Sequence, residues 1–81
     1  DLGTNMKKRK HKICYKVAIK NGYRNIYKQK TFWDYLPTDE YGTVRREKVL
    51  ERIYSDMRDS GFTPCRLVWY RFETYDPKID G

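Results

Sequence analysis

Long apolar runs are missing from this 81-residue sequence, in which 38% of the residues are hydrophobic. No run approaches the length of about 18 residues that a membrane-spanning helix needs, so we expect no membrane partner. The pattern of charged start, apolar middle and small-residue cleavage site that marks a signal peptide is missing too. The aromatic content of 16% is nevertheless too high for a fully disordered chain, and the length fits one small domain.

Cysteine and histidine are scarce, with Cys14, Cys65 and His11 as the complete set. A secreted domain of this size that depends on disulfides usually carries several cysteine pairs, so we expect reduced thiols and an intracellular protein. The sequence leaves open whether the two cysteines are bridged. No Cys-x-x-Cys pair or His/Cys cluster supplies the ligands of a structural zinc site. We therefore expect no metal and no cofactor.

The residues that carry catalysis in enzymes are few and poorly placed. His11 lies in a basic run, where we expect none of the ordered geometry that a general base needs. Neither cysteine has a second histidine to activate it as a nucleophile. Asp34, Asp39 and Glu40 are the carboxylates with which a nuclease would hold Mg²⁺, but such a cluster is more typical of a solvated turn. We predict a protein that is not an enzyme.

Acidic residues are absent from positions 2–33, which carry ten basic residues. The first 33 residues sum to a charge of +9 and the remaining 48 to −2, for a net charge of +7. A one-sided field of this kind attracts polyanions, whereas an ordinary solvated face mixes the two signs. The charge pattern therefore favours nucleic acid, or an acidic protein surface, as the partner.

The basic residues crowd the beginning of the chain, which favours a flexible segment there. We expect residues 1–12 to form a basic arm, residues 13–75 to form the folded domain, and residues 76–81 to form a loose tail. Residues 1–5 differ in character from the basic run after Met6, and Met6 is a candidate natural start. Residues 1–5 are therefore a candidate remnant of expression and are not counted among the functional residues.

A β-hairpin is the clearest local signal. Apolar and polar residues alternate over 13–20 with the period of a half-buried strand. Asn21-Gly22 comes next, and this pair favours a two-residue hairpin turn because both residues accept positive φ angles. A second strand would then cover 23–33. The hairpin is predicted to be the framework of the domain.

The register of this hairpin decides which side chains share a face. A turn at Asn21-Gly22 sets Val17 opposite Ile26. A turn one residue longer would set Lys16 opposite Lys28, and like charges that face each other destabilise a hairpin. We therefore prefer the shorter turn.

A helix and a third strand are predicted after the hairpin. The hydroxyl of Thr43 is a candidate helix cap, and Gly61 suits the left-handed position just past a helix end. The apolar residues between them have the spacing of one helix face: Val49, Leu50, Ile53, Tyr54 and Met57. Residues 65–74 are rich in aromatic and branched side chains and predict a strand. The chain order favours a single small α+β domain, a three-stranded mostly antiparallel sheet (β-β-α-β) with one helix packed on one face.

The predicted core takes the inward residues of the first two strands and the helix, together with one side of the third strand. Its members are Ile13, Tyr15, Val17, Ile19, Ile26, Val49, Leu50, Ile53, Met57, Leu67 and Trp69. The third strand is apolar on its other side as well, where Tyr70 and Phe72 lie. Either this strand is central in the sheet, or its aromatic rings are exposed for a functional reason.

The other face of the hairpin is predicted to mix lysines with flat rings. With the basic arm and Tyr70 from the third strand, it makes up the candidate nucleic-acid-binding residues: Lys7, Lys8, Arg9, Lys10, Lys12, Lys16, Lys20, Tyr23, Arg24, Tyr27, Lys28, Trp33 and Tyr70. On a single strand, lysines meet phosphates and bases stack on rings. On a duplex, a two-stranded ribbon fits the major groove, with Arg24 near its end.

We therefore predict a non-enzymatic nucleic-acid-binding module, with DNA or RNA and the oligomeric state left open. The alternative is a small protein-binding module or inhibitor, because tyrosine and arginine are also common at the centres of protein interfaces. In length and composition the chain is similar to small proteins of phages and mobile elements. Under the alternative it would act on a host protein or nucleoprotein complex.

Overall fold

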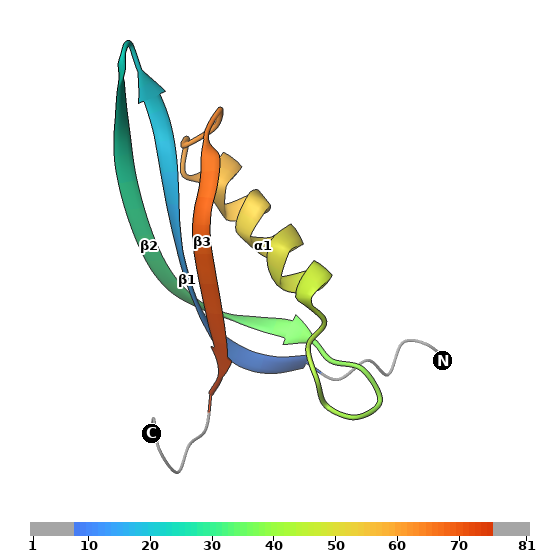
Figure 1. Ribbon diagram of the computed structural model, residues 1–81. Helices are drawn as coiled ribbons and strands as arrows, with labels where there is room; N and C mark the ends of the chain where they lie inside the picture. The colour runs from blue at the N-terminus through green and yellow to red at the C-terminus, as the bar shows by residue number, and fades with distance from the viewer. Residues whose placement is uncertain (1–7, 76–81) are drawn as a thin grey trace.

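A computed structural model describes residues 8–75 of the chain (Figure 1). Its elements are β1 (Lys8–Asn21), β2 (Arg24–Pro37), α1 (Arg46–Asp59) and β3 (Arg66–Thr74). β1 lies in the centre of a three-stranded sheet and runs antiparallel to both β2 and β3. The helix α1 packs across one face of this sheet (Figure 1). The predicted α+β domain with the order β-β-α-β is confirmed.

The central strand begins earlier than the sequence predicts. Residues 8–12, which we assigned to the flexible arm, are strand residues, with Lys8 opposite Pro37 and Lys12 opposite Trp33. Their regular pairing shows that a run of basic residues can form a strand when its long side chains reach solvent. Residues 1–7 of the predicted arm, which include Lys7, and the predicted tail 76–81 lie outside the described residues.

His11 is the inward-facing residue of this basic segment. It is 1% exposed. Its Nδ1 donates to the backbone oxygen of Arg9 at 2.9 Å, and its Nε2 accepts from the hydroxyl of Thr74 at 3.0 Å. The expectation that His11 lies in a mobile arm is wrong. The histidine ties the beginning of β1 to the end of β3.

The hairpin turns one residue later than predicted. Asn21 pairs with Arg24, so Gly22 and Tyr23 form the turn, and Val17 lies opposite Lys28 rather than Ile26. Gly22 has a φ of +68° and no non-glycine residue described has a positive φ, which is the glycine-first pattern of a type II′ turn. The predicted register is therefore wrong by two positions. Because two is the side-chain period of a strand, the hairpin residues still share the predicted faces.

A bulge in β3 changes which residues face the helix. Lys16 lies opposite Trp69, whereas Val17 lies opposite Leu67, so Val68 is an extra residue in β3. The bulge lets both Leu67 and Tyr70 pack against the core. Trp69 lies on the opposite face, beside Lys16. The assignment of Trp69 to the core is wrong for this reason.

The core lies between α1 and the sheet. It consists of Ile13, Tyr15, Val17, Leu36, Val44, Val49, Ile53 and Met57, with further side chains packed around its rim. Ile26, predicted for the core, is 39% exposed. The end of the hairpin extends past the helix, as Figure 1 shows, and so has nothing to pack against.

The start of α1 differs from the prediction. The capping residue is Arg45, and no side chain caps the first turn. Thr43 lies in the preceding loop, where its backbone N–H donates to the carboxylate of Asp39 at 2.9 Å. The same carboxylate accepts the backbone N–H of Tyr41 at 2.9 Å. The loop is thus held by Asp39, and the prediction of a Thr43 cap is wrong.

The end of α1 matches the prediction. Gly61 has a φ of +74°. Its N–H donates to the carbonyl of Arg58 at 3.0 Å, and the N–H of Phe62 donates to the carbonyl of Met57 at 2.9 Å. These two bonds are the Schellman motif, in which glycine takes the left-handed position.

Gly61→Ala is expected to lower the free energy of unfolding by about 1 kcal/mol, because a side chain disfavours positive φ. A Cβ at this position meets no atom within 4 Å, so the effect comes from the backbone angle alone. Urea titration measures it against the exposed control Asp59→Ala. A loss no greater than that of the control would contradict the role of the glycine.

A buried carboxylate joins α1 to the sheet. Asp56 is 7% exposed and accepts a hydrogen bond from the hydroxyl of Tyr15 at 2.5 Å. The ammonium of Lys30 lies 3.0 Å from the same carboxylate and donates to the hydroxyl of Ser60 at 2.8 Å. Burial and the nearby Asp56 raise the pKa of Tyr15, so its hydroxyl keeps the proton that it donates.

The pKa of Asp56 reflects these partners. Burial raises the pKa, but the hydrogen bonds from Tyr15 and Lys30 and the charges of Lys30 and Arg52 outweigh it, so the pKa lies below 3.8. The pKa of Asp34 is lowered in the same way, with burial opposed mainly by its hydrogen bond from Arg52. Both carboxylates are stabilised in their charged form by the fold.

Stability is therefore expected to fall in acid. A carboxyl whose pKa is lowered by folding stabilises the protein above its unfolded pKa of about 3.9, and this stabilisation is lost as the pH falls towards the folded value. Urea titrations from about pH 5 to pH 2 at constant salt should show this decline. Asp56→Asn should make the decline shallower, whereas Asp59→Asn should not. An unchanged pH dependence in Asp56→Asn would contradict the assignment.

Candidate nucleic-acid interface

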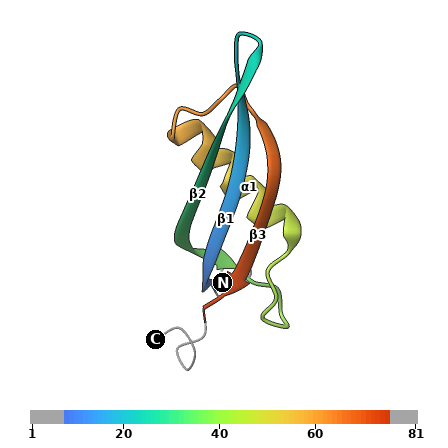
Figure 2. The same ribbon diagram turned by 60° about the vertical axis from the view of Figure 1, so that its left-hand side comes forward.

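The face of the sheet opposite α1 is not covered by any described element. Figure 2 shows the three strands in front and α1 behind them. Paired residues of neighbouring strands point to the same side, so the register identifies the members of this open face. They are Lys10, Lys12, Cys14, Lys16, Ala18 and Lys20 from β1, Asn25, Tyr27, Gln29, Thr31, Trp33 and Tyr35 from β2, and Arg66, Trp69, Arg71 and Glu73 from β3.

The open face is strongly basic. Its six cations come from two strands: Lys10, Lys12, Lys16 and Lys20 from β1, and Arg66 and Arg71 from β3. Glu73 is the one acid among the members of the face, and it lies on the edge strand β3. The lysines at positions 12, 16 and 20 are spaced at intervals of four residues. At about 3.4 Å per residue they form a row about 27 Å long.

Cations lie over aromatic rings along this face. The Lys16 ammonium is 5.1 Å from the ring centre of Tyr27, and the Arg71 guanidinium is 5.7 Å from that of Trp69. Such contacts contribute about 0.5–1 kcal/mol at exposed sites. Tyr27 is 52% exposed. The rings are thus accessible from solvent, and each already has a cationic partner.

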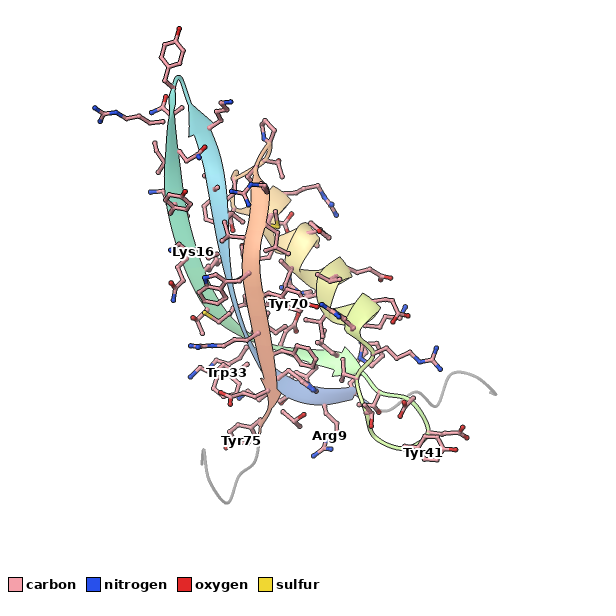
Figure 3. The ribbon with its side chains drawn as sticks, in the orientation of Figure 1. Arg9, Lys16, Trp33, Tyr41, Tyr70 and Tyr75 are labelled. Carbon is pink, nitrogen blue, oxygen red and sulfur yellow. The ribbon has the colours of Figure 1, made fainter. Side chains whose placement is uncertain are left out.

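A second group of rings lies at the end of the sheet where β1 begins and β3 ends, next to the His11–Thr74 pair. The rings of Trp33 and Tyr75 meet edge to face with centres 5.6 Å apart. The Lys10 ammonium is 5.3 Å from the first ring and 5.0 Å from the second. Tyr75 is held there by its backbone N–H, which donates to the Lys10 carbonyl at 2.8 Å. Figure 3 shows Trp33 and Tyr75 near each other at this end of the sheet.

Six of the predicted binding residues share the open face. These are Lys10, Lys12, Lys16, Lys20, Tyr27 and Trp33. The others lie elsewhere. Tyr23 is exposed at the hairpin turn, whereas Arg24 and Lys28 point to the helix side of the hairpin. Lys8 is the first residue of β1, and its charge helps to lower the pKa of Asp34. Arg9 lies near Gly42.

Tyr70 does not belong to this face. It lies opposite Tyr15 and packs against the core, and its hydroxyl accepts a hydrogen bond from Arg46. Figure 3 shows it between β3 and α1. Phe72 lies opposite Ile13 and faces the same side. The expectation that these two rings join the lysines is wrong, because the bulge reverses the faces of β3.

Among the cations and rings of the interface, sequence reasoning missed five: Tyr35, Arg66, Trp69, Arg71 and Tyr75. Trp69 and Arg71 were hidden by the bulge, which no local pattern marks. Tyr75 continues the alternation of positions 71 and 73, so a correct face for β3 would have found it. Together with Lys16 and Trp33, they extend the mixed cationic and aromatic surface across all three strands.

The two cysteines considered as nucleophiles lie on opposite faces of the sheet. Cys14 is buried in the open face and Cys65 packs against the core on the other face, and both are free thiols. Within residues 8–75, no three His, Cys, Asp or Glu side chains come together as a metal site. In the same part of the chain, no helix has the length and hydropathy to cross a membrane.

Comparison of the chain with protein families, with curated proteins and with solved structures gives no match. The function of the chain is therefore inferred from the geometry of the open face.

Proposed function

We propose that the protein is a non-enzymatic nucleic-acid-binding module and that its open face contacts the nucleic acid. The observation that carries this proposal is the mixture of six cations with exposed rings on one uncovered sheet face. Lysine and arginine neutralise phosphates, and aromatic rings stack on bases. Both kinds of contact are available here on a rigid sheet.

On binding, a contact between a lysine and a ring can be replaced by two contacts, one between the ring and a base and one between the lysine and a phosphate. A lysine over a ring gains about 0.5–1 kcal/mol at an exposed site. A base stacked on the same ring gains about 1–3 kcal/mol. The lysine side chain is long enough to swing to a phosphate, where its hydrogen bond is charge-assisted. Exchange of the Lys16–Tyr27 contact for both new contacts is therefore favourable.

The helix side offers a poorer site. The exposed part of α1 mixes charges of both signs, with the Lys48 ammonium 3.8 Å from the Glu51 carboxylate. Such a surface has no strong field of one sign. The open face is thus the better candidate for a polyanion.

Fluorescence anisotropy with labelled oligonucleotides from 50 to 300 mM salt tests the proposal. With six phosphate contacts, the logarithm of the affinity should fall against that of salt with a slope of about −5 for a duplex and about −4 for a single strand. Lys16→Ala should make the slope shallower by about 1. Arg58→Ala, which removes the same charge from the exposed side of α1, should change the slope much less.

Tyr27→Ala is expected to weaken binding by about 5-fold or more, because the ring contributes contact area beyond charge. The same anisotropy titration at 150 mM salt measures this loss. Binding that vanishes by 150 mM salt and ignores Tyr27→Ala would contradict the proposal. The open face would then be assigned to the alternative function, docking on an acidic protein surface, and a pull-down would be the next experiment.

A further inference from the structure

We propose that the nucleic acid is a B-form DNA duplex and that the β1–β2 hairpin enters its major groove. This inference rests on the proposed function and names the class of ligand that the open face takes. Two observations carry it, the curvature of the sheet and the composition of the hairpin end.

The sheet curves around α1, so the open face is convex. Figure 1 shows β1 and β2 bending beneath α1 at the end where β1 begins and β2 ends. A convex surface protrudes and fits a groove, whereas single strands are usually bound along a concave channel. The major groove of B-DNA is about 12 Å wide and admits a two-stranded ribbon. The shape of the face therefore favours a duplex.

The hairpin tip, defined here as residues 20–29, projects beyond the rest of the fold. The pairing of β3 with β1 ends at Ala18. Every residue of the hairpin tip is exposed. Figures 1 and 2 both show it extending past α1 and β3. It is thus a free ribbon two strands wide, with strands about 4.8 Å apart.

The composition of the hairpin tip matches the chemistry of base edges. It contains three cations, Lys20, Arg24 and Lys28, and three side-chain amides, Asn21, Asn25 and Gln29. It contains no acid. Arginine and lysine donate to the acceptors of guanine in the major groove, and asparagine and glutamine form paired bonds with adenine. Of these side chains, Lys20, Asn25 and Gln29 lie on the open face and are placed to read bases, whereas Asn21, Arg24 and Lys28 point to the helix side.

The rest of the open face would then hold the duplex backbone. Lys10, Lys12 and Lys16 form a row about 20 Å long, which is about 6 base-pair steps of 3.4 Å. Arg71 lies on the neighbouring strand β3. In this arrangement the hairpin tip reads the groove, while cations farther along the sheet position the protein on phosphates.

The test compares one sequence of about 16 base pairs as duplex DNA, as each single strand and as duplex RNA, at 150 mM salt. Duplex DNA should bind at least about 10-fold more tightly than either single strand. Duplex RNA should also bind at least about 10-fold more weakly, because its major groove is deep and narrow. Duplex DNA that carries glucosylated 5-hydroxymethylcytosine, whose sugars fill the major groove, should lose about 10-fold or more. Netropsin, a minor-groove ligand, should not compete.

Variants of the hairpin tip form the second part of the experiment. Lys20→Ala and Asn25→Ala should each weaken duplex binding by about 5-fold or more. Both residues are exposed, so circular dichroism and urea titration should show no loss of fold. Arg58→Ala on α1 is the matched control for charge and should have a smaller effect than Lys20→Ala.

The outcomes separate this inference from the proposed function. Equal or tighter binding of a single strand, or competition by netropsin with no effect of glucosylation, would overturn the major-groove assignment and leave nucleic-acid binding intact. Absence of binding to every oligonucleotide would overturn both. Tight duplex binding that is lost on glucosylation and weakened by Lys20→Ala would support both.

Discussion

Asp56→Ala is expected to lower the free energy of unfolding by about 3 kcal/mol. The change leaves the buried hydroxyl of Tyr15 without its acceptor, and an unsatisfied buried polar group costs about 1–3 kcal/mol. It also removes the partner of Lys30. The Lys30 side chain is 37% exposed, so solvent screening makes this second loss smaller than for a fully buried pair. A domain of this size has a total stability of only about 5 kcal/mol.

Urea titration at neutral pH measures this loss, with Asp59→Ala as the matched control. Asp59 is an exposed carboxylate at the end of the same helix, and its replacement should change stability by less than about 0.5 kcal/mol. The double variant Tyr15→Phe/Asp56→Ala removes both hydrogen-bonding groups and should lose less than the sum of the two single variants. Similar losses for Asp56→Ala and the control would show that the carboxylate does not hold α1 to the sheet.

The second large effect is expected on binding. The double variant Lys12→Glu/Lys16→Glu should weaken DNA binding by about 100-fold or more at 150 mM salt, because two phosphate contacts become two repulsions. The double variant Lys48→Glu/Arg58→Glu changes the net charge by the same amount on the helix. It should lose much less, because its charges lie on the other side of the sheet.

Anisotropy titrations of the two double variants against the same duplex give the comparison. Lys12 and Lys16 are only partly buried, and their replacement leaves the core residues untouched, so urea titration should show both proteins folded. Equal losses for the two double variants would mean that the net charge, and not the open face, governs binding.

The fold was predictable because the periodic signals are local. Alternation over 13–20, the apolar helix stripe and the glycine at position 61 each depend on a few neighbouring residues. The faces of the hairpin were also predictable, even though the turn lies at Gly22-Tyr23. A turn displaced by one residue moves the partner strand by two positions, which preserves the side to which each side chain points.

The third strand was not predictable, because its faces depend on tertiary packing. The bulge at Val68 lets Leu67 and Tyr70 both pack beneath α1, and nothing in the local sequence marks it. The early start of β1 was hidden by a different cause. Residues 8–12 are mostly basic, and their one buried side chain is His11, whose burial depends on Thr74 at the far end of the described chain.

The exposure of the hairpin tip has a consequence for how this protein can change. Because residues 20–29 lie beyond the core, substitutions there remove little buried area and should leave stability almost unaltered. Under the proposed binding mode, target preference and stability therefore depend on separate parts of the chain. Variation confined to this ribbon allows new binding preferences to evolve, or to be grafted by engineers, while the scaffold beneath stays the same.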